Sequence, residues 1–263
     1  MMTRNKSLIL ILSYLLISCV QVQTIHSEGI DAEKVLVSDW DDTIAYMPTK
    51  IFLFKKHTGE TLEVSTGEYA NEGKAIGKKG KYLNYQIKNE SFKFFSVAGE
   101  LDDQESYFKD DVVSMLQRPQ NEWKGPYFDN VIKMLSNPQT AELTYILTAR
   151  GHSSYEIMLG LNKLKSHLQQ TSGLQIMLPP EQNLLMVSAA ADVPKKKGEE
   201  MVRLIRKYAG TKVKIIEFVD DDFKNTDAVA KAVAEIQNEL KIKIIVTHVS
   251  RNSRSSVVFT GLN

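Results

Sequence analysis

The sequence predicts an α/β fold, a Rossmann-like parallel sheet of five strands with helices on both faces. The first indication is that short β-branched runs alternate with segments of helical periodicity from Lys34 to Val249. The second is a single interruption between Tyr46 and about Gly125, about eighty residues that are far more than a strand-to-helix connection needs. Because strands alternating with helices form right-handed crossovers, we expect one parallel sheet with an inserted, cap-like region after its first strand.

Each expected strand is a short apolar run bounded by charge, glycine or polar residues. In chain order the five strands cover Lys34–Asp39, Glu142–Gly151, Asn183–Ala189, Lys212–Asp221 and Ile242–Val249. The helices carry apolar residues every three or four positions, and we expect them at Trp123–Leu135, Ser153–Gln170, Lys196–Gly210 and Asn225–Lys241. Within the insertion, at about 46–125, the sequence predicts a hairpin around His57–Glu60 and a helix from Tyr107 to Arg118.

Composition sets the broad class of the protein. The chain has 263 residues, 43% of them hydrophobic and 25% charged, with a formal net charge of +1. These values are ordinary for a globular chain, long enough for one large domain with an insertion, which we place at 33–263. A near-neutral charge argues against a dedicated nucleic-acid binder, so no nucleic-acid partner is expected.

The N-terminus has the features of an export signal. Arg4 and Lys6 precede an apolar run, Leu8 to Ser18, which is short for a membrane span and is followed by the only cysteine, Cys19. The segment "LISC" resembles a bacterial lipobox, so we expect a signal peptide at 1–18, lipid on Cys19 and a polar tether at 19–32. The alternative is an ordinary secretory signal in which Cys19 has no role. Either interpretation predicts that the protein is exported, and the first predicts that lipid anchors it in the bacterial cell envelope.

Polar side chains gather where the predicted strands end. The first strand runs into Asp39-Trp40-Asp41-Asp42-Thr43, the second ends at Thr148, and the fourth ends in Asp220-Asp221-Asp222; Lys197 precedes the helix leading to the fourth. Ligands of open parallel sheets bind beyond the carboxyl ends of the strands, so these groups are expected to converge. Carboxylates alone would repel one another and a phosphate, whereas Mg²⁺ prefers carboxylate oxygens together with water and phosphate. The sequence therefore predicts a site for Mg²⁺ and a phosphate group.

These segments resemble the four motifs of the haloacid dehalogenase (HAD) superfamily, in its phosphatase branch. "DWDDT" is similar to Asp-x-Asp-x-Thr, and "ILTARG" is similar to an apolar strand that ends in Thr or Ser. "KKG" before an apolar-periodic helix resembles the lysine motif, and "FVDDD" resembles the acidic pair after an apolar strand. The first motif alone is common, so the resemblance depends on all four in order. It covers about Glu33–Lys56 and Trp123–Val249, and the inserted region matches nothing.

The resemblance implies a Mg²⁺-dependent phosphomonoester hydrolase that acts on a small phosphorylated substrate. Asp39 would be the nucleophile that forms an aspartyl-phosphate, and Asp41 the general acid and then the general base. Thr148 and Lys197 would bind the phosphate. The implied metal site consists of Asp39, Asp41 through its backbone carbonyl, Asp220 and Asp221.

Two of these assignments have close alternatives in the sequence. Lys197 is one of three consecutive lysines, Lys195–Lys197, and we choose it because it directly precedes Gly198 and the helix. The triplet Asp220–Asp222 leaves the register open by one residue, and we expect Asp222 to cap the next helix. Asp42 and Thr43 are expected to shape the turn after the first strand.

A competing function is a catalytically inactive HAD scaffold, a surface lipoprotein that serves as a binding module. The presence of Asp39, Asp41 and Thr148 together favours catalysis, because a binding module would not need all three. A third alternative is another HAD chemistry, such as phosphotransfer to an alcohol or dehalogenation. Asp41 argues against dehalogenation, which does not use this second acid. Nucleotides, sugar phosphates, phospholipid head groups and nucleic-acid ends all remain compatible as substrates.

Overall fold

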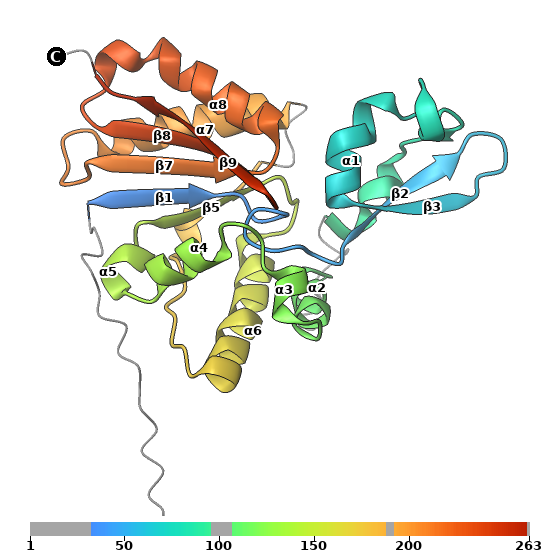
Figure 1. Ribbon diagram of the computed structural model, residues 1–263, viewed down its shortest axis with the longest axis horizontal. Coiled ribbons are helices and arrows are strands. Elements are labelled where there is room, and N and C mark those ends of the chain that lie inside the picture. The colour runs from blue at the N-terminus through green and yellow to red at the C-terminus, as the bar shows by residue number, and fades with distance from the viewer. Residues whose placement is uncertain (1–32, 96–106, 188–191, 262–263) are drawn as a thin grey trace, which may run out of the picture.

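The computed structural model describes residues 33–95, 107–187 and 192–261. It is an α/β protein with a mixed, mostly parallel sheet flanked by helices (Figure 1). The six strands of this main sheet lie in the order β6-β5-β1-β7-β8-β9. Their bounds are β1 Lys34–Ser38, β5 Thr144–Thr148, β6 Leu184–Met186, β7 Ile215–Asp220, β8 Lys243–Ser250 and β9 Ser253–Phe259.

The five predicted strands all form, and they pair in parallel from β6 to β8. The prediction of five was nevertheless incomplete, because β9 pairs antiparallel with β8 and adds a sixth strand. β9 is exposed along almost its whole length and so lacks the alternating apolar pattern that marks a half-buried strand. The central strand is β1, where Leu36 lies opposite Thr144 on β5 and Glu217 on β7.

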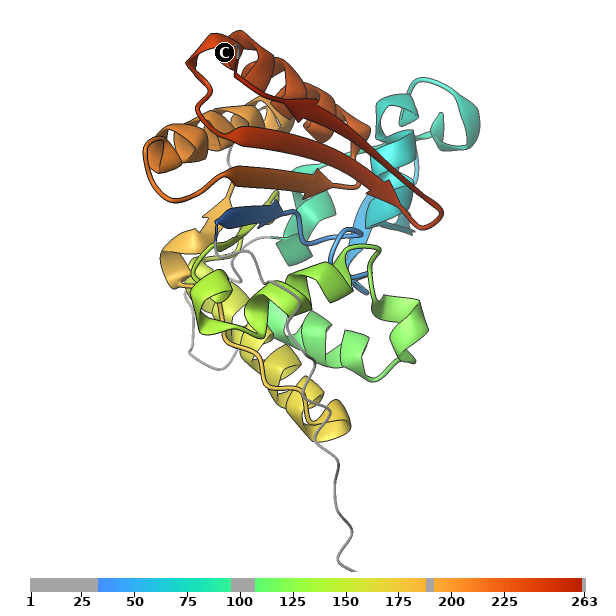
Figure 2. The same ribbon diagram turned by 60° about the vertical axis from the view of Figure 1, so that its left-hand side comes forward.

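Helices cover both faces of the main sheet (Figure 2). Side chains of β1 alternate between the two faces, as the strand period requires. Val35 and Val37 join the apolar cluster beneath α7 and α8, while Leu36 joins the cluster on the opposite face. The helices are α2 Tyr107–Leu116, α3 Gln120–Trp123, α4 Phe128–Leu135, α5 Pro138–Ala141, α6 Ser154–Ser172, α7 Val193–Tyr208 and α8 Phe223–Glu235, with short 3₁₀ turns η4 Glu181–Asn183 and η5 Gln237–Glu239.

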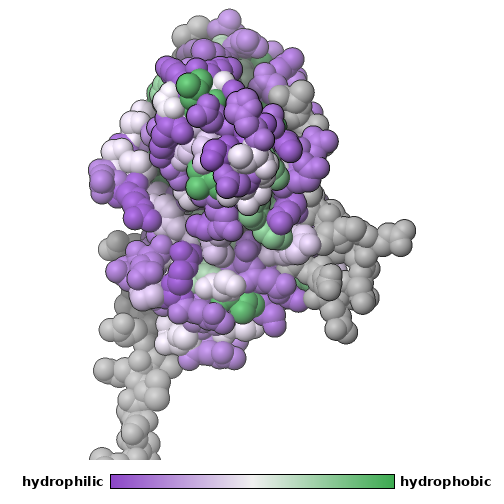
Figure 3. All heavy atoms as spheres, turned by 90° about the vertical axis from the view of Figure 1, so that its right-hand side faces the viewer, coloured by the Kyte–Doolittle hydropathy of each residue, from purple (hydrophilic) through white to green (hydrophobic). Residues whose placement is uncertain are grey.

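A second, smaller sheet follows β1 and lies apart from the main sheet, at the right of Figure 1. Its strands lie in the order β3-β2-β4, and the hairpin predicted around His57–Glu60 is confirmed by the antiparallel pairing of β2 with β3. Its own apolar cluster consists of Ile51, Leu53, Val64, Ile76 and Tyr82. Figure 3 shows that the face of the molecule on this side is mostly hydrophilic. The elements are β2 Lys50–Lys55, β3 Thr61–Ser65, α1 Thr66–Glu72, η1 Gly73–Ala75, η2 Gly80–Tyr82, β4 Tyr85–Gln86 and η3 Asn89–Phe95.

The helix predicted at Tyr107 packs on the main body of the protein. Phe108 and Val112 of α2 lie against α6, and a Cβ atom on Gly160 would come within 2.5 Å of the Phe108 ring. Gly160 therefore allows the two helices to approach closely. The structure thus places α2 with the main core, and the separate apolar cluster of the second sheet draws its residues from 51–95.

The N-terminal predictions concern residues outside the described part of the chain. The signal peptide at 1–18, the tether at 19–32 and Cys19 all precede the first described residue, Glu33. Within the described residues, no helix has the length and apolar character to span a bilayer.

Candidate active site

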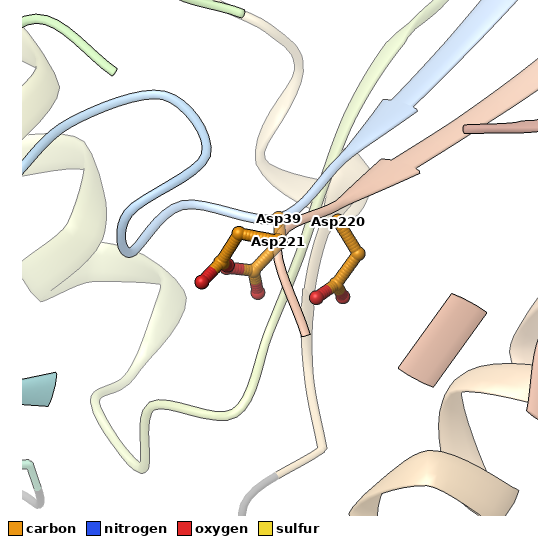
Figure 4. A group of neighbouring side chains, drawn as sticks. All are labelled: Asp39, Asp220 and Asp221. Atoms are coloured by element: carbon orange, nitrogen blue, oxygen red, sulfur yellow. The ribbon is translucent and has the colours of Figure 1, made fainter. Parts of the chain in front are cut away.

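Three carboxylates meet at the carboxyl ends of the two central strands. Asp39 directly follows β1, Asp220 is the last residue of β7, and Asp221 comes next. One oxygen from each side chain lies within 4.8 Å of the others. Figure 4 shows the three side chains leaving these strand ends toward a common space. β1 and β7 are parallel neighbours, so their ends lie at the same edge of the sheet, as the sequence predicts.

Lys197 reaches this cluster from α7. Its Nζ atom lies 2.6 Å from Asp39 Oδ1 and 2.7 Å from Asp220 Oδ2, and the side chain is buried. Of the three consecutive lysines, Lys195 is exposed and Lys196 pairs with Glu199 at the surface. Gly198 contributes to this arrangement, because a Cβ atom there would lie only 3.1 Å from Ala232 on α8.

The charges of the cluster do not balance. Burial raises the pKa of Asp39, and Lys197 opposes this shift without cancelling it. Burial, with the charges of Asp220 and Asp39, also raises the pKa of Asp221. Burial disfavours the ammonium of Lys197, but the carboxylates of Asp220 and Asp39 raise its pKa overall. Two buried carboxylates, Asp39 and Asp220, and the half-buried carboxylate of Asp221 thus face one ammonium, and this all-oxygen donor set fits a hard divalent cation that would supply further positive charge.

Asp220 is held by donors from the start of α8. Its Oδ1 accepts from the backbone N–H of Asp222 at 2.9 Å, and the Asn225 amide donates to both oxygens at 3.0 and 3.1 Å. Asp222 caps α8, since its Oδ1 accepts from the Lys224 N–H at 2.8 Å, as expected from the sequence. Asn225 was missed at the sequence level, although its position on the first turn after the acidic triplet was a usable signal.

The turn after β1 contributes two further contacts. The Thr43 hydroxyl donates to Asp221 Oδ1 at 3.0 Å, so Thr43 orients a carboxylate of the cluster as well as shaping the turn. Asp42 has a positive φ of 58° and accepts from the Thr66 hydroxyl of α1 at 2.7 Å. Burial raises the pKa of Asp42 to about 6. This turn therefore connects the carboxylate cluster with the second sheet.

The Asp41 side chain lies outside the carboxylate cluster. Its Oδ2 accepts from Arg150 Nε at 2.8 Å and its Oδ1 from Arg150 Nη2 at 2.7 Å. Arg150 is fully buried; Nη2 also donates to Thr49 at 2.7 Å, and the guanidinium lies 4.9 Å from the centre of the Phe95 ring. Gly151 N–H donates to the Phe95 carbonyl at 2.6 Å. Sequence reasoning missed Arg150, whose position two residues after Thr148 was the available signal.

Thr148 is buried at the end of β5, one strand away from Asp39. Its Oγ1 accepts from the Arg150 N–H at 3.2 Å. The residues that follow it, Ala149 to Gly151, line a cavity next to the carboxylates, but Thr148 itself does not. The structure thus brings Thr148 close to the site without exposing its side chain to this cavity.

The cavity lies between the strand ends and the second sheet. It has a volume of about 710 Å³ and contains the carboxylates of the cluster, Lys197 and Arg150. Its other side is formed by residues of the second sheet and its helices: Ile51, Thr66, Tyr69, Ala70, Asn89, Phe92 and Phe95. A cavity of this size lies within the range of small-molecule binding sites.

Fold and site together define an α/β protein with an acidic pocket, partly neutralised by one buried lysine, at the carboxyl ends of its parallel strands. Comparison with protein-family models, with curated proteins and with solved structures finds no match.

Proposed function

We propose that the protein is a Mg²⁺-dependent phosphomonoester hydrolase of the HAD type, with Asp39 as its nucleophile. The observation that carries this proposal is the 2.6 Å contact between Lys197 Nζ and Asp39 Oδ1, two residues 158 positions apart in the chain. A buried cation beside a carboxylate can neutralise both the nucleophile and an incoming phosphate. In this proposal the five parallel strands form the HAD core, and the second sheet forms a cap over the cavity.

The reaction begins with attack by an Asp39 oxygen on phosphorus. A new bond joins that oxygen to phosphorus, the bond to the leaving oxygen breaks, and Asp41 gives its proton to the leaving alkoxide. Asp41, now a carboxylate, takes a proton from a water molecule, whose oxygen attacks the aspartyl-phosphate. The bond between phosphorus and Asp39 breaks, which releases inorganic phosphate and restores the Asp39 carboxylate.

Asp39 and Asp221 would hold the Mg²⁺ ion through carboxylate oxygens, together with the backbone carbonyl of Asp41. Asp220 is the fourth candidate ligand, although its oxygens already accept from Lys197, Asn225 and the Asp222 N–H. Bound there, Mg²⁺ neutralises the charge of the carboxylates and of the phosphate. Burial and the neighbouring carboxylates raise the pKa of Asp39 and of Asp221, so a bound divalent cation would favour the charged form of both groups.

Lys197 and Thr148 are assigned to the phosphate; Lys197 lines the cavity, whereas the buried Thr148 side chain does not and would have to become accessible to the phosphate. The Thr148 oxygen already accepts from the Arg150 N–H, so its hydroxyl hydrogen is the group it can offer to a phosphoryl oxygen. Lys197 has three N–H donors, of which two contact Asp39 and Asp220. The third is available to the phosphate.

Asp41 must leave Arg150 to act as the acid. A bidentate guanidinium contact stabilises the carboxylate form, which carries no proton to donate. An inactive scaffold would also retain this pair between Arg150 and Asp41. An assay of phosphatase activity therefore tests the binding-module alternative as well.

The test is a phosphatase assay of the fragment from Glu33 onward with a panel of phosphate monoesters and Mg²⁺. Asp39→Asn should abolish hydrolysis while circular dichroism and the unfolding midpoint show a folded protein. Asp110→Asn is the control, because Asp110 lies exposed on α2 away from the cavity. Full activity in Asp39→Asn would overturn the mechanism, and a folded wild type that hydrolyses nothing would favour the binding module.

We also propose that lipid on Cys19 holds the protein in the bacterial cell envelope. The support is the position of Cys19 directly after the apolar run of the N-terminus. Durable anchoring needs two or more acyl chains, which a diacylglyceryl-modified cysteine supplies. The wild-type chain should incorporate labelled fatty acid in a bacterial host, and Cys19→Ser should not. Absence of label from the wild type would leave a plain secretory signal as the explanation.

A further inference from the structure

We propose that the cavity selects phosphate monoesters whose alcohol carries a flat aromatic ring system and no second anionic group. The inference rests on the proposed function for turnover, but it concerns binding and can be tested separately. The residues that support it line the side of the cavity that the carboxylates do not form.

Aromatic side chains of the second sheet region form that side. Tyr69 of α1 and Phe92 and Phe95 of η3 all line the cavity. Tyr69 and Phe92 meet edge to face, with ring centres 5.3 Å apart and planes at 81°. Phe92 and Phe95 do the same at 6.2 Å and 78°. Contacts of this kind fix the ring orientations and provide surfaces on which a planar ligand can stack.

The surroundings of these rings are also suited to a ring ligand. Ile51 and Ala70 add apolar surface next to them, and Asn89 offers an exposed amide at the start of η3. An amide can both donate and accept, so it can bind the polar edge of a heteroaromatic ring. The volume of about 710 Å³ leaves room for an organic group beyond the phosphate.

Charge limits the substrate to one anionic group. Among the described residues that line the cavity, the only cationic side chains are Arg150 and Lys197. Arg150 is bound to Asp41, and Lys197 is bound to Asp39 and Asp220. Three further carboxylates, Asp42, Asp221 and Asp222, also line the cavity. A second phosphate or a carboxylate on the substrate would therefore meet repulsion rather than an unpaired cation.

The test compares adenosine 5′-monophosphate with ribose 5-phosphate, which share the same leaving oxygen and differ by the base. Binding is measured by calorimetry on Asp39→Asn with Mg²⁺, where turnover is blocked, and kcat/KM is measured on the wild type. We expect the nucleotide to bind at least tenfold tighter than ribose 5-phosphate. Adenosine diphosphate should bind more weakly than the monophosphate. Equal binding of the nucleotide and the sugar phosphate, or preference for the diphosphate, would overturn the inference.

Single substitutions test the aromatic wall, which consists of Tyr69, Phe92 and Phe95, separately from the rest of the fold. Phe92→Leu should weaken nucleotide binding about three- to tenfold, the range typical of one aromatic contact, and leave ribose 5-phosphate unchanged. Phe94→Leu is the matched control, because Phe94 lies in the same 3₁₀ segment but contacts Phe52 and Tyr107 and does not line the cavity. The same loss in both variants would contradict a role for the wall. If nucleotide binding is selective but no monoester is hydrolysed, this inference stands and the proposed hydrolase fails.

Discussion

Arg150 holds Asp41 through both carboxylate oxygens, at 2.8 Å and 2.7 Å. The guanidinium is buried, and it also contacts Thr49 and the rings of Phe95 and Phe108. One side chain thus joins the turn after β1, the entry to the second sheet and α2. Replacing it affects stability and the position of Asp41 together.

Arg150→Met should lower the free energy of unfolding by about 3 kcal/mol, because it leaves the partly buried Asp41 carboxylate without its partner. Urea unfolding measures this loss. Arg203→Met is the control: Arg203 forms an exposed pair with Glu200, worth less than about 1 kcal/mol. Equal losses of unfolding free energy in the two variants would show that the buried pair stabilises the protein no more than the exposed pair does.

Asp221→Ala should weaken Mg²⁺ binding at least tenfold, since Asp221 belongs to the carboxylate cluster. Asp222→Ala should leave Mg²⁺ binding nearly unchanged and lower stability by about 1 kcal/mol through loss of the α8 cap. Calorimetric titration with Mg²⁺ and urea unfolding give the two quantities. A larger loss of Mg²⁺ affinity in Asp222→Ala would place the metal ligand one residue later.

Lys197→Met should destabilise the metal-free protein by about 3 kcal/mol at pH 8, because Asp39 and Asp220 lose their shared cation. The pKa of Asp39 should rise further in the folded variant. An acid with a raised folded pKa favours folding at low pH, so the deficit relative to wild type should shrink by pH 5. Lys196→Met, at a surface pair, should cost less than about 1 kcal/mol at either pH. A deficit in Lys197→Met that does not vary with pH would contradict the electrostatic explanation.

Asp42→Asn should stabilise the metal-free protein at pH 7 by about 1–2 kcal/mol. The pKa of Asp42 is raised from 3.8 to about 6 by burial, so between these values the folded protein binds a proton that the unfolded chain has released. Stability of the wild type therefore falls as pH rises through this range, and the asparagine variant lacks this contribution. Asparagine tolerates the positive φ and can still accept from Thr66. The difference in unfolding free energy should vanish near pH 3.5, and a difference that persists there would refute the titration of Asp42 as its cause.

Sequence patterns predicted the parallel strands because each is apolar, short and clearly bounded. They did not predict β9, whose residues Ser253–Phe259 are mostly exposed and give no alternation. The sequence predicted the part of the site that is determined by where the strands end. Asp39, Asp220 and Asp221 converge there, as expected. The sequence did not predict the pair between Arg150 and Asp41. The two residues are 109 positions apart, and several acidic residues could pair with this one guanidinium.

Both described ends of the second sheet region are hydrogen-bonded to the loop that follows β5. Thr49, just before β2, accepts from Arg150, and Phe95, at the end of η3, accepts from Gly151. Arg150 also holds Asp41, so one loop positions both ends of the second sheet region and the proposed proton donor. A substitution that displaces Arg150 would therefore change the placement of the second sheet over the cavity together with the placement of Asp41, and the two effects would not be separable by a change at Arg150 alone.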